Sequence, residues 1–244
     1  MGVVLIMADS AAGTEDKNHE KSGYSPVLEE TLFVAKAGLR LRMSEVAIAT
    51  ALQYYHTFQS TMEKNRFDEN LVAMACLFLA AKAQEVSLRL SDLVNTCYHI
   101  LHHDKPQLEV SSLYWQLKES VAKMELVLLR ALKFEFQLDL PHRYLLHHLL
   151  SLSHWVEPSQ WHSSHVTRLS WSLLQDSFHT TLNHIHPPNK MAVAVLYLAV
   201  KVSRLVIPSP GSRYQWWEVM CPGVTEPELQ TLCEAIMNLY QNEK

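Results

Sequence analysis

Histidine, a common metal ligand, is frequent in this chain. The chain contains 14 histidines, and the densest groups are His102-His103, His147-His148 and His184-x-His186. Metal sites combine His with Cys or carboxylates at fixed spacing, and neither that spacing nor an H-E-x-x-H motif accompanies these groups. We therefore expect solvated or capping histidines, with no bound metal and no cofactor.

The sequence gives equally weak support to a catalytic serine site and to a phosphate-binding site. Ser151, Ser153 and His154 are neighbours within one predicted helix, without the strand–turn–helix elbow that exposes a catalytic serine. No G-x-x-x-x-G-K-[ST] or G-x-G-x-x-G motif occurs, and the chain has only 6 glycines. The sequence thus predicts a protein that is not itself an enzyme.

Two opposite charges stand at the edges of predicted core helices. Lys82 is the first charge after the apolar run Leu71 to Ala81, so its ammonium must emerge where a buried helix ends. Glu125 is flanked by the core positions Met124 and Leu128. The two charges could pair and offer hydrogen bonds to a partner's backbone. The alternative is snorkelling with an ordinary surface ion pair, worth about 0–1 kcal/mol.

The apolar run predicts the central helix of the first half, residues 71–85, with Asn70 as N-cap. Its four alanines allow other helices to approach closely, and it is too short for a bilayer, which needs about 20 residues. Apolar spacing predicts four further helices in this half, at 26–37 with Gly38 as C-cap, from the N-cap Ser44 to Phe58, from Ser91, and at 111–132. Phe134 to Leu138 is expected to be an extended linker.

The second half is predicted to repeat this plan. Helices are expected from Pro141, from Gln160 to His179, over the apolar stretch 189–205, at 216–220 and at 225–241. Displaced by 119 residues, Ala73 falls on Ala192 and Lys82 falls on Lys201, which we expect to keep an ordinary surface role. The prediction is an all-α protein of two five-helix bundles, each around a buried third helix.

Composition sets the remaining expectations. Residues 1–25 are polar and lack periodicity, which predicts a disordered tail before a first domain at 26–138 and a second at 139–244. The net charge of -4 disfavours nucleic-acid wrapping. Four cysteines without a disulfide-like framework, and no signal peptide, indicate an intracellular protein, nuclear and/or cytoplasmic and not membrane-bound.

Four motifs in order resemble the cyclin family. They are the IATA signature at Ile48 to Ala51, the "LA-x-K-x-E-E" pattern at Leu79 to Glu85, "E-x-x-L-L-R-x-L-x-F" at Glu125 to Phe134, and "P-H-x-Y-L" at Pro141 to Leu145. Together they imply a tandem cyclin-box fold over residues 26–241. Within the family the resemblance is closest to the small atypical group called cyclin Q or cyclin M.

The resemblance implies a regulatory subunit that binds and activates a cyclin-dependent kinase as a heterodimer, and for this group cyclin-dependent kinase 10. By motif match, Lys82 and Glu125 face the kinase, with Glu85 in the same surface. The M-R-A-I-L motif that recruits Arg-x-Leu substrates is absent, and Leu39 to Met43 stands near that region. This favours a transcription-type or atypical cyclin over a cell-cycle cyclin.

Two other classes of function stay open at this level. A cyclin-box scaffold that binds transcription factors or promoter DNA without activating a kinase would need a basic stripe, and salt-sensitive DNA binding would reveal it. A metal or small-molecule enzyme would need a site that the sequence does not contain.

Overall fold

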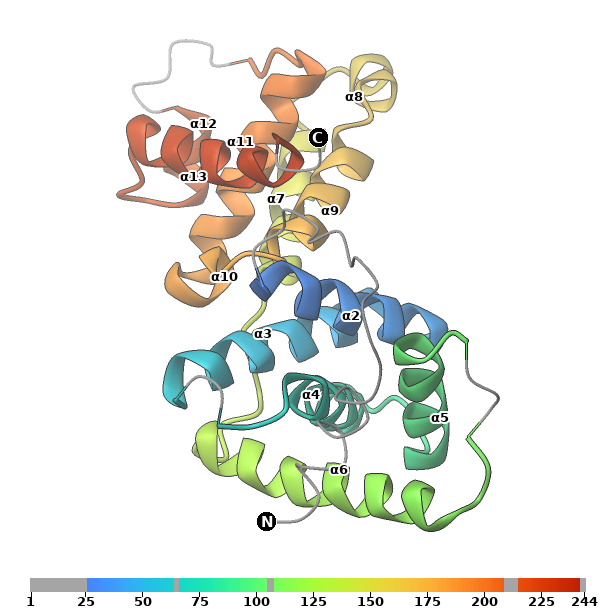
Figure 1. The fold of residues 1–244 in the computed structure, drawn as a ribbon. Coiled ribbons are helices and arrows are strands. Elements are labelled where there is room, and N and C mark those ends of the chain that lie inside the picture. The colour runs from blue at the N-terminus through green and yellow to red at the C-terminus, as the bar shows by residue number, and fades with distance from the viewer. Residues whose placement is uncertain (1–25, 64–65, 105–107, 209–214, 242–244) are drawn as a thin grey trace. The chain divides into compact units, whose positions relative to one another are not determined.

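The computed structural model describes residues 26–63, 66–104, 108–208 and 215–241, so the predicted tail at 1–25 lies outside the described residues. The chain divides into two compact units, Met1–Leu138 and Asp139–Lys244. Every regular element in the described part is a helix (Figure 1). Among the same residues, no helix combines the length and the apolar character that crossing a membrane requires.

In its described residues, the first unit surrounds one helix with four others. Its elements are α2 (Pro26–Arg40), α3 (Glu45–Thr61), α4 (Glu69–Ala83), α5 (Leu90–Leu101) and α6 (Ser112–Ala131). Figure 1 shows α4 end-on within a ring of the other helices, and α4 packs against all four of them. This is the predicted five-helix bundle around a buried third helix.

Small and apolar residues allow α4 to occupy that centre. All residues from Val72 to Leu77 are buried, and Ala80 is 0% exposed. The helix begins earlier than predicted, because Asp68 and not Asn70 is its N-cap. The Asp68 carboxylate accepts a hydrogen bond from the Leu71 backbone N–H at 2.9 Å, which satisfies one of the free donors of the first turn.

Gly38 serves helix packing and not helix termination. The predicted C-cap at Gly38 is wrong, because α2 continues to Arg40 and the left-handed residue that follows is Arg42, at φ 55°. A Cβ built on Gly38 would lie 2.6 Å from Cγ1 of Ile48, far inside van der Waals contact. Glycine therefore allows α2 to lie close against α3.

The described part of the second unit has four longer helices and three short ones. They are α7 (Pro141–Ser153), α8 (Pro158–Ser164), α9 (Val166–Ser177), α10 (Leu182–Ile185), α11 (Pro188–Ser203), α12 (Trp216–Met220) and α13 (Glu226–Gln241). The central one is α11, which packs against α7, α9 and α13. Residues 191–200 are buried without exception, so α11 has the environment that its likeness to α4 predicts.

The single helix predicted from Gln160 to His179 is wrong. His165 adopts a left-handed conformation, φ 55°, and separates α8 from α9. The apolar positions that suggested one long helix begin at Val166 and therefore belong to α9, whereas α8 has no buried residue. The periodicity is real, but it extends over fewer residues than the prediction assumed.

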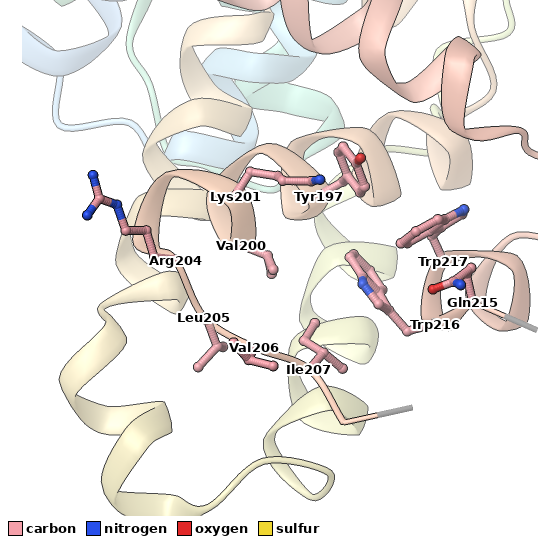
Figure 2. A pocket seen from close by; sticks show the side chains of 10 residues that line it. All are labelled: Tyr197, Val200, Lys201, Arg204, Leu205, Val206, Ile207, Gln215, Trp216 and Trp217. Carbon is pink, nitrogen blue, oxygen red and sulfur yellow. The ribbon is translucent and has the colours of Figure 1, made fainter. Parts of the chain in front are cut away.

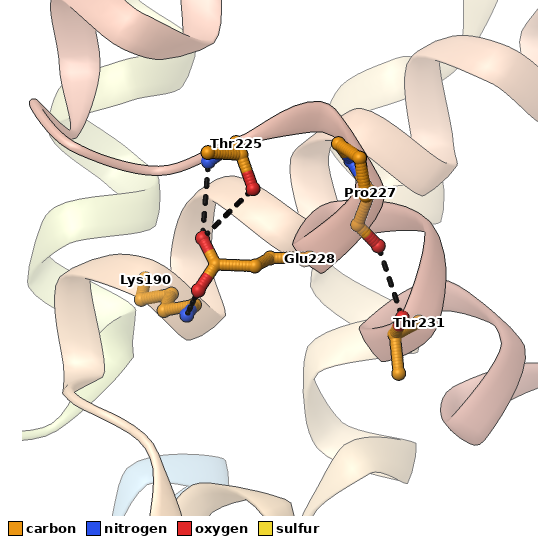
Figure 3. Close-up of polar contacts among 5 residues, drawn as sticks. All are labelled: Lys190, Thr225, Pro227, Glu228 and Thr231. Atoms are coloured by element: carbon orange, nitrogen blue, oxygen red, sulfur yellow. Dashed lines mark hydrogen bonds and ion pairs between the residues drawn. The ribbon is translucent and has the colours of Figure 1, made fainter.

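A polar network fixes the start of α13 against α11 (Figure 3). One carboxylate oxygen of Glu228 accepts hydrogen bonds from the backbone N–H and the hydroxyl of Thr225, at 3.0 and 3.2 Å. The other oxygen binds the Lys190 ammonium at 3.1 Å, and the Thr231 hydroxyl donates to the Pro227 carbonyl at 3.0 Å. The bond from the Thr225 N–H is the main cause that lowers the pKa of Glu228.

Candidate functional site

Lys82 and Glu125, which are 43 residues apart in sequence, form an ion pair between α4 and α6. The Lys82 ammonium lies 2.6 Å from Oε1 and 2.8 Å from Oε2 of Glu125. The Glu125 side chain is 11% exposed and that of Lys82 is 53% exposed. The pair therefore stands at the boundary between the core and the surface, with its cationic side open to a partner.

The two helices dictate this geometry. Lys82 lies in the last turn of α4, where its ammonium also sits 4.2 Å from the centroid of the Phe78 ring, a favourable cation–π position. Glu125 lies on the buried face of α6, beside the fully packed Leu128. Loss of Lys82 would leave an almost buried carboxylate without its counter-charge, which is more costly than loss of a surface pair.

Glu85 lies on the turn that ends α4 and is exposed. Its backbone is left-handed, φ 54°, and its N–H donates to the Lys82 carbonyl at 3.2 Å. A second contact holds this turn, because the Gln84 side-chain amide donates to the Thr50 hydroxyl of α3 at 3.2 Å. The structure thus brings Lys82 and Glu125 into contact and places Glu85 three residues beyond Lys82.

An apolar side chain that the sequence reasoning missed extends this surface. Lys133 and Phe134 are consecutive left-handed residues after α6, at φ 52° and 61°, and the Phe134 N–H donates to the Leu129 carbonyl at 2.9 Å. This turn leaves the Phe134 ring 63% exposed. Leu129 is one helical turn after Glu125. We refer to Lys82, Glu85, Glu125, Leu129 and Phe134 as the α4–α6 surface.

The extended linker after α6 supports this turn. The predicted extended linker, Phe134 to Leu138, is wrong at Phe134, which belongs to the left-handed turn, whereas residues 135–138 are non-helical as predicted. The Tyr54 hydroxyl of α3 donates to the Phe136 carbonyl. Tyr54 is 0% exposed, so the linker is attached to the core of the first unit. Large exposed apolar side chains are common singly on protein surfaces, but Phe134 follows directly after the helix that carries Glu125. That combination suits a protein-binding site better than a small-molecule site.

The repeat of α4 in the second unit does not repeat the ion pair. Lys201 corresponds to Lys82, and Tyr197 stands where the first unit has Phe78. The Lys201 ammonium lies 5.1 Å from the centroid of the Tyr197 ring, and the Tyr197 hydroxyl donates to Glu226 at 2.7 Å. In the second unit a tyrosine hydroxyl therefore binds the Glu226 carboxylate, whereas in the first unit a lysine binds the Glu125 carboxylate.

The histidine groups do not assemble into a metal site. Across the described parts of the chain, no three His, Cys, Asp or Glu side chains gather in a geometry that could hold a metal ion. His148 instead forms a hydrogen bond between Nε2 and Oδ1 of Asn189, at 2.7 Å. Burial lowers the pKa of His148, which favours the neutral ring. The structure thus gives His148 a packing role.

Comparisons with known proteins identify the fold. Residues 31–137 match the family model "Cyclin, N-terminal domain". The chain is 28% identical over 219 residues to Cyclin-K of Danio rerio, covering 88% of this chain and 50% of the relative. It is 32% identical over 234 residues to Cyclin-L1 of Gallus gallus, covering 91% of this chain and 42% of the relative. The chain thus spans half or less of the length of both relatives.

The solved structures agree at the level of the fold. A chain of the yeast RNA Pol II CTD kinase CTDK-1 complex superimposes with a TM-score of 0.69 at 18% identity, covering 88% of this chain and 64% of that chain. The fold is therefore a helical cyclin box. The family model matches residues 31–137, and the two relatives are similar to most of this chain.

Proposed function

We propose that this chain is the regulatory subunit of a cyclin-dependent protein kinase, which it binds and activates through the α4–α6 surface. The observation that carries the proposal is the Lys82–Glu125 ion pair at the edge of a cyclin box. The chain contributes no catalytic residue, and the kinase performs the phosphate transfer.

The geometry suits the activation of a kinase. A protein kinase is active when a glutamate of its mobile helix pairs with the lysine that orients the ATP phosphates. A rigid neighbour can hold that helix inward if it offers hydrogen bonds and apolar contact. An ammonium carries three donors. Two of them face the Glu125 oxygens, which leaves a donor on the exposed side of Lys82 for a backbone carbonyl of the partner helix.

The apolar part of the surface would supply the contact area. Phe134 is 63% exposed and can insert against a partner, and aromatic side chains often contribute most of the binding energy at such interfaces. Glu85 adds a carboxylate at the end of α4. Its left-handed backbone fixes the turn from which this carboxylate projects.

The specific partner is proposed from sequence resemblance. The cyclin Q or cyclin M group shares the "AVAVLYLA" stretch at Ala192 to Ala199 and the Trp216-Trp217 pair, which favours cyclin-dependent kinase 10. We further propose that residues 139–244 form a second cyclin box, because α11 repeats α4 in sequence and burial. A kinase of this class would place the complex inside the cell, in the nucleus and/or the cytoplasm.

The test is co-expression with cyclin-dependent kinase 10 and a panel of other cyclin-dependent kinases, followed by size-exclusion chromatography and a phosphate-transfer assay. We expect co-elution and activity with wild type, and loss of both with Lys82→Ala/Glu125→Ala. Lys201→Ala is the matched control, because it removes the corresponding lysine of the second unit. Co-elution with another kinase would refute the specific partner. Separate elution from every kinase would refute the activator role and favour the scaffold hypothesis.

A further inference from the structure

A pocket of about 350 Å³ opens on the second unit between the end of α11 and α12 (Figure 2). One wall is the last turn of α11 with the extended segment that follows it, and the other wall is α12. The aliphatic part of the lining is Val200, Leu205, Val206 and Ile207, and the aromatic part is Tyr197, Trp216 and Trp217. Its volume lies at the lower end of the range for binding sites, about 300–1,000 Å³.

The three aromatic rings form a packed corner. Tyr197 and Trp216 are roughly parallel, with 6.2 Å between ring centroids and an interplanar angle of 28°. Trp217 stands almost perpendicular to both, at 88° to Tyr197 and 83° to Trp216. Its centroid lies 5.2 Å from that of Tyr197 and 5.6 Å from that of Trp216, so the rings touch and leave no space for a cation between them. This excludes an aromatic cage for methylated lysine.

The two tryptophans differ in exposure, which shows which ring a ligand could reach. Trp216 is 6% exposed and completes the core against Tyr197. Trp217 is only partly buried, and Figure 2 shows it at the side of the open space, facing Val200 and Ile207 across Trp216. Trp217 thus keeps part of its side chain accessible at the side of the pocket.

The charged residues that line the pocket are of one sign. Its ten lining residues include two cations, Lys201 and Arg204, and no carboxylate. The nearby Glu226 carboxylate accepts a hydrogen bond from the Tyr197 hydroxyl. A hydrogen bond between Lys201 and the same hydroxyl raises the pKa of the lysine. Figure 2 shows Lys201 along the rim beside Tyr197, and Arg204 at the far end with its guanidinium directed outward. Both cations are exposed, so they border the opening and attract anions toward it.

We propose that this pocket docks an acidic segment of a partner protein. One apolar or aromatic side chain of the segment enters the open space against the aliphatic wall, and flanking Asp or Glu residues face Lys201 and Arg204. The site goes beyond the proposed kinase activation, because it lies on the second unit and shares no residue with the α4–α6 surface. It gives the protein a means of recruiting a second partner.

A peptide fits the pocket better than a nucleic-acid strand. Single-stranded nucleic acids are bound by a line of cations that follows the phosphate backbone, with several aromatic platforms for successive bases. This pocket has two cations and one accessible aromatic ring. Its opening is otherwise aliphatic, with Val206 78% exposed at the rim. Such a site selects an apolar side chain and a short acidic neighbourhood.

The experiment selects random peptides displayed on phage against the full chain, with counter-selection on the Trp217→Ala variant. The selected peptides are then labelled and titrated by fluorescence anisotropy. We expect them to carry an aromatic or aliphatic residue flanked by Asp or Glu, and we expect Lys201→Glu to weaken binding about tenfold or more. Arg168→Glu is the matched control, because Arg168 is an exposed cation of α9 outside the pocket. It should leave the affinity unchanged.

A second variant separates binding from folding. Val206→Glu places a carboxylate at an exposed rim position, so the chain stays folded while an acidic peptide is repelled. Its melting temperature should equal that of wild type, and its affinity should fall about tenfold. The proposal is overturned if no peptide depends on the pocket, if the selected peptides are basic or uncharged, or if both glutamate variants bind them normally. Trp217-dependent binding of fluorescent oligothymidine in place of peptides would also overturn it.

Discussion

Replacing Gly38 with alanine tests the close packing of α2 on α3. The new Cβ would lie 2.6 Å from Cγ1 and 3.0 Å from Cδ1 of Ile48, whose side chain is 5% exposed. Ile48 is β-branched and has little freedom in χ1 within a helix, so it cannot turn away. Overpacking of this kind costs about 1–3 kcal/mol, and the higher helix propensity of alanine returns up to about 1 kcal/mol. We expect Gly38→Ala to lower the free energy of unfolding by about 1–2 kcal/mol.

A double-mutant cycle with Ile48→Ala isolates the cause. Ile48→Ala removes both clashing carbons, so Gly38→Ala in that background should be neutral or stabilising by up to about 1 kcal/mol. Urea denaturation followed by circular dichroism measures the four free energies of unfolding. The reasoning is refuted if Gly38→Ala stabilises the wild-type background, or if it has the same effect in both backgrounds.

Two further predictions concern the first unit. Burial, and next the hydrogen bond to Glu69, raise the pKa of Glu30 to about 8 from 4.5. The folded state thus keeps a proton that the unfolded chain releases, so stability should fall as the pH rises between these values. Glu30→Gln should remove this decline in melting temperature, and an unchanged decline would contradict the assignment to Glu30. Ala80, at 0% exposure, has no room for a larger side chain, so Ala80→Trp should unfold the first unit. Unchanged melting would show that α4 is not packed on all sides.

The central helices were predictable because their amino-acid composition, a run of apolar residues, indicates burial. An apolar run without polar interruption can only be buried, and this holds for both α4 and α11. Helix ends were harder, because they depend on single backbone angles. Arg42 and His165 adopt left-handed conformations, at φ 55° each, although neither is glycine, the residue type that most often marks such a position. The predicted C-cap at Gly38 and the predicted single helix across 160–179 were therefore wrong.

The candidate site was predictable in part. The position of Lys82 after the apolar run showed that a charge emerges where α4 ends, and the structure supplies its partner, Glu125. The sequence could not show the orientation of Phe134, because its exposure follows from two consecutive left-handed residues after α6. Nor could it show the pocket on the second unit, since the pocket depends on how α12 packs against α11.

The most direct test of the central claim is a charge swap, Lys82→Glu/Glu125→Lys, measured by affinity for the kinase. The swap keeps an ion pair between α4 and α6 while reversing the charges presented to a partner. The control swap is Glu119→Lys/Lys123→Glu, which reverses an exposed pair on α6, with 2.7 Å between its charged atoms. We predict that both proteins melt near the wild-type temperature, and that only the first loses kinase binding and activation. Normal kinase binding by the folded Lys82→Glu/Glu125→Lys protein would contradict an interface role for this pair.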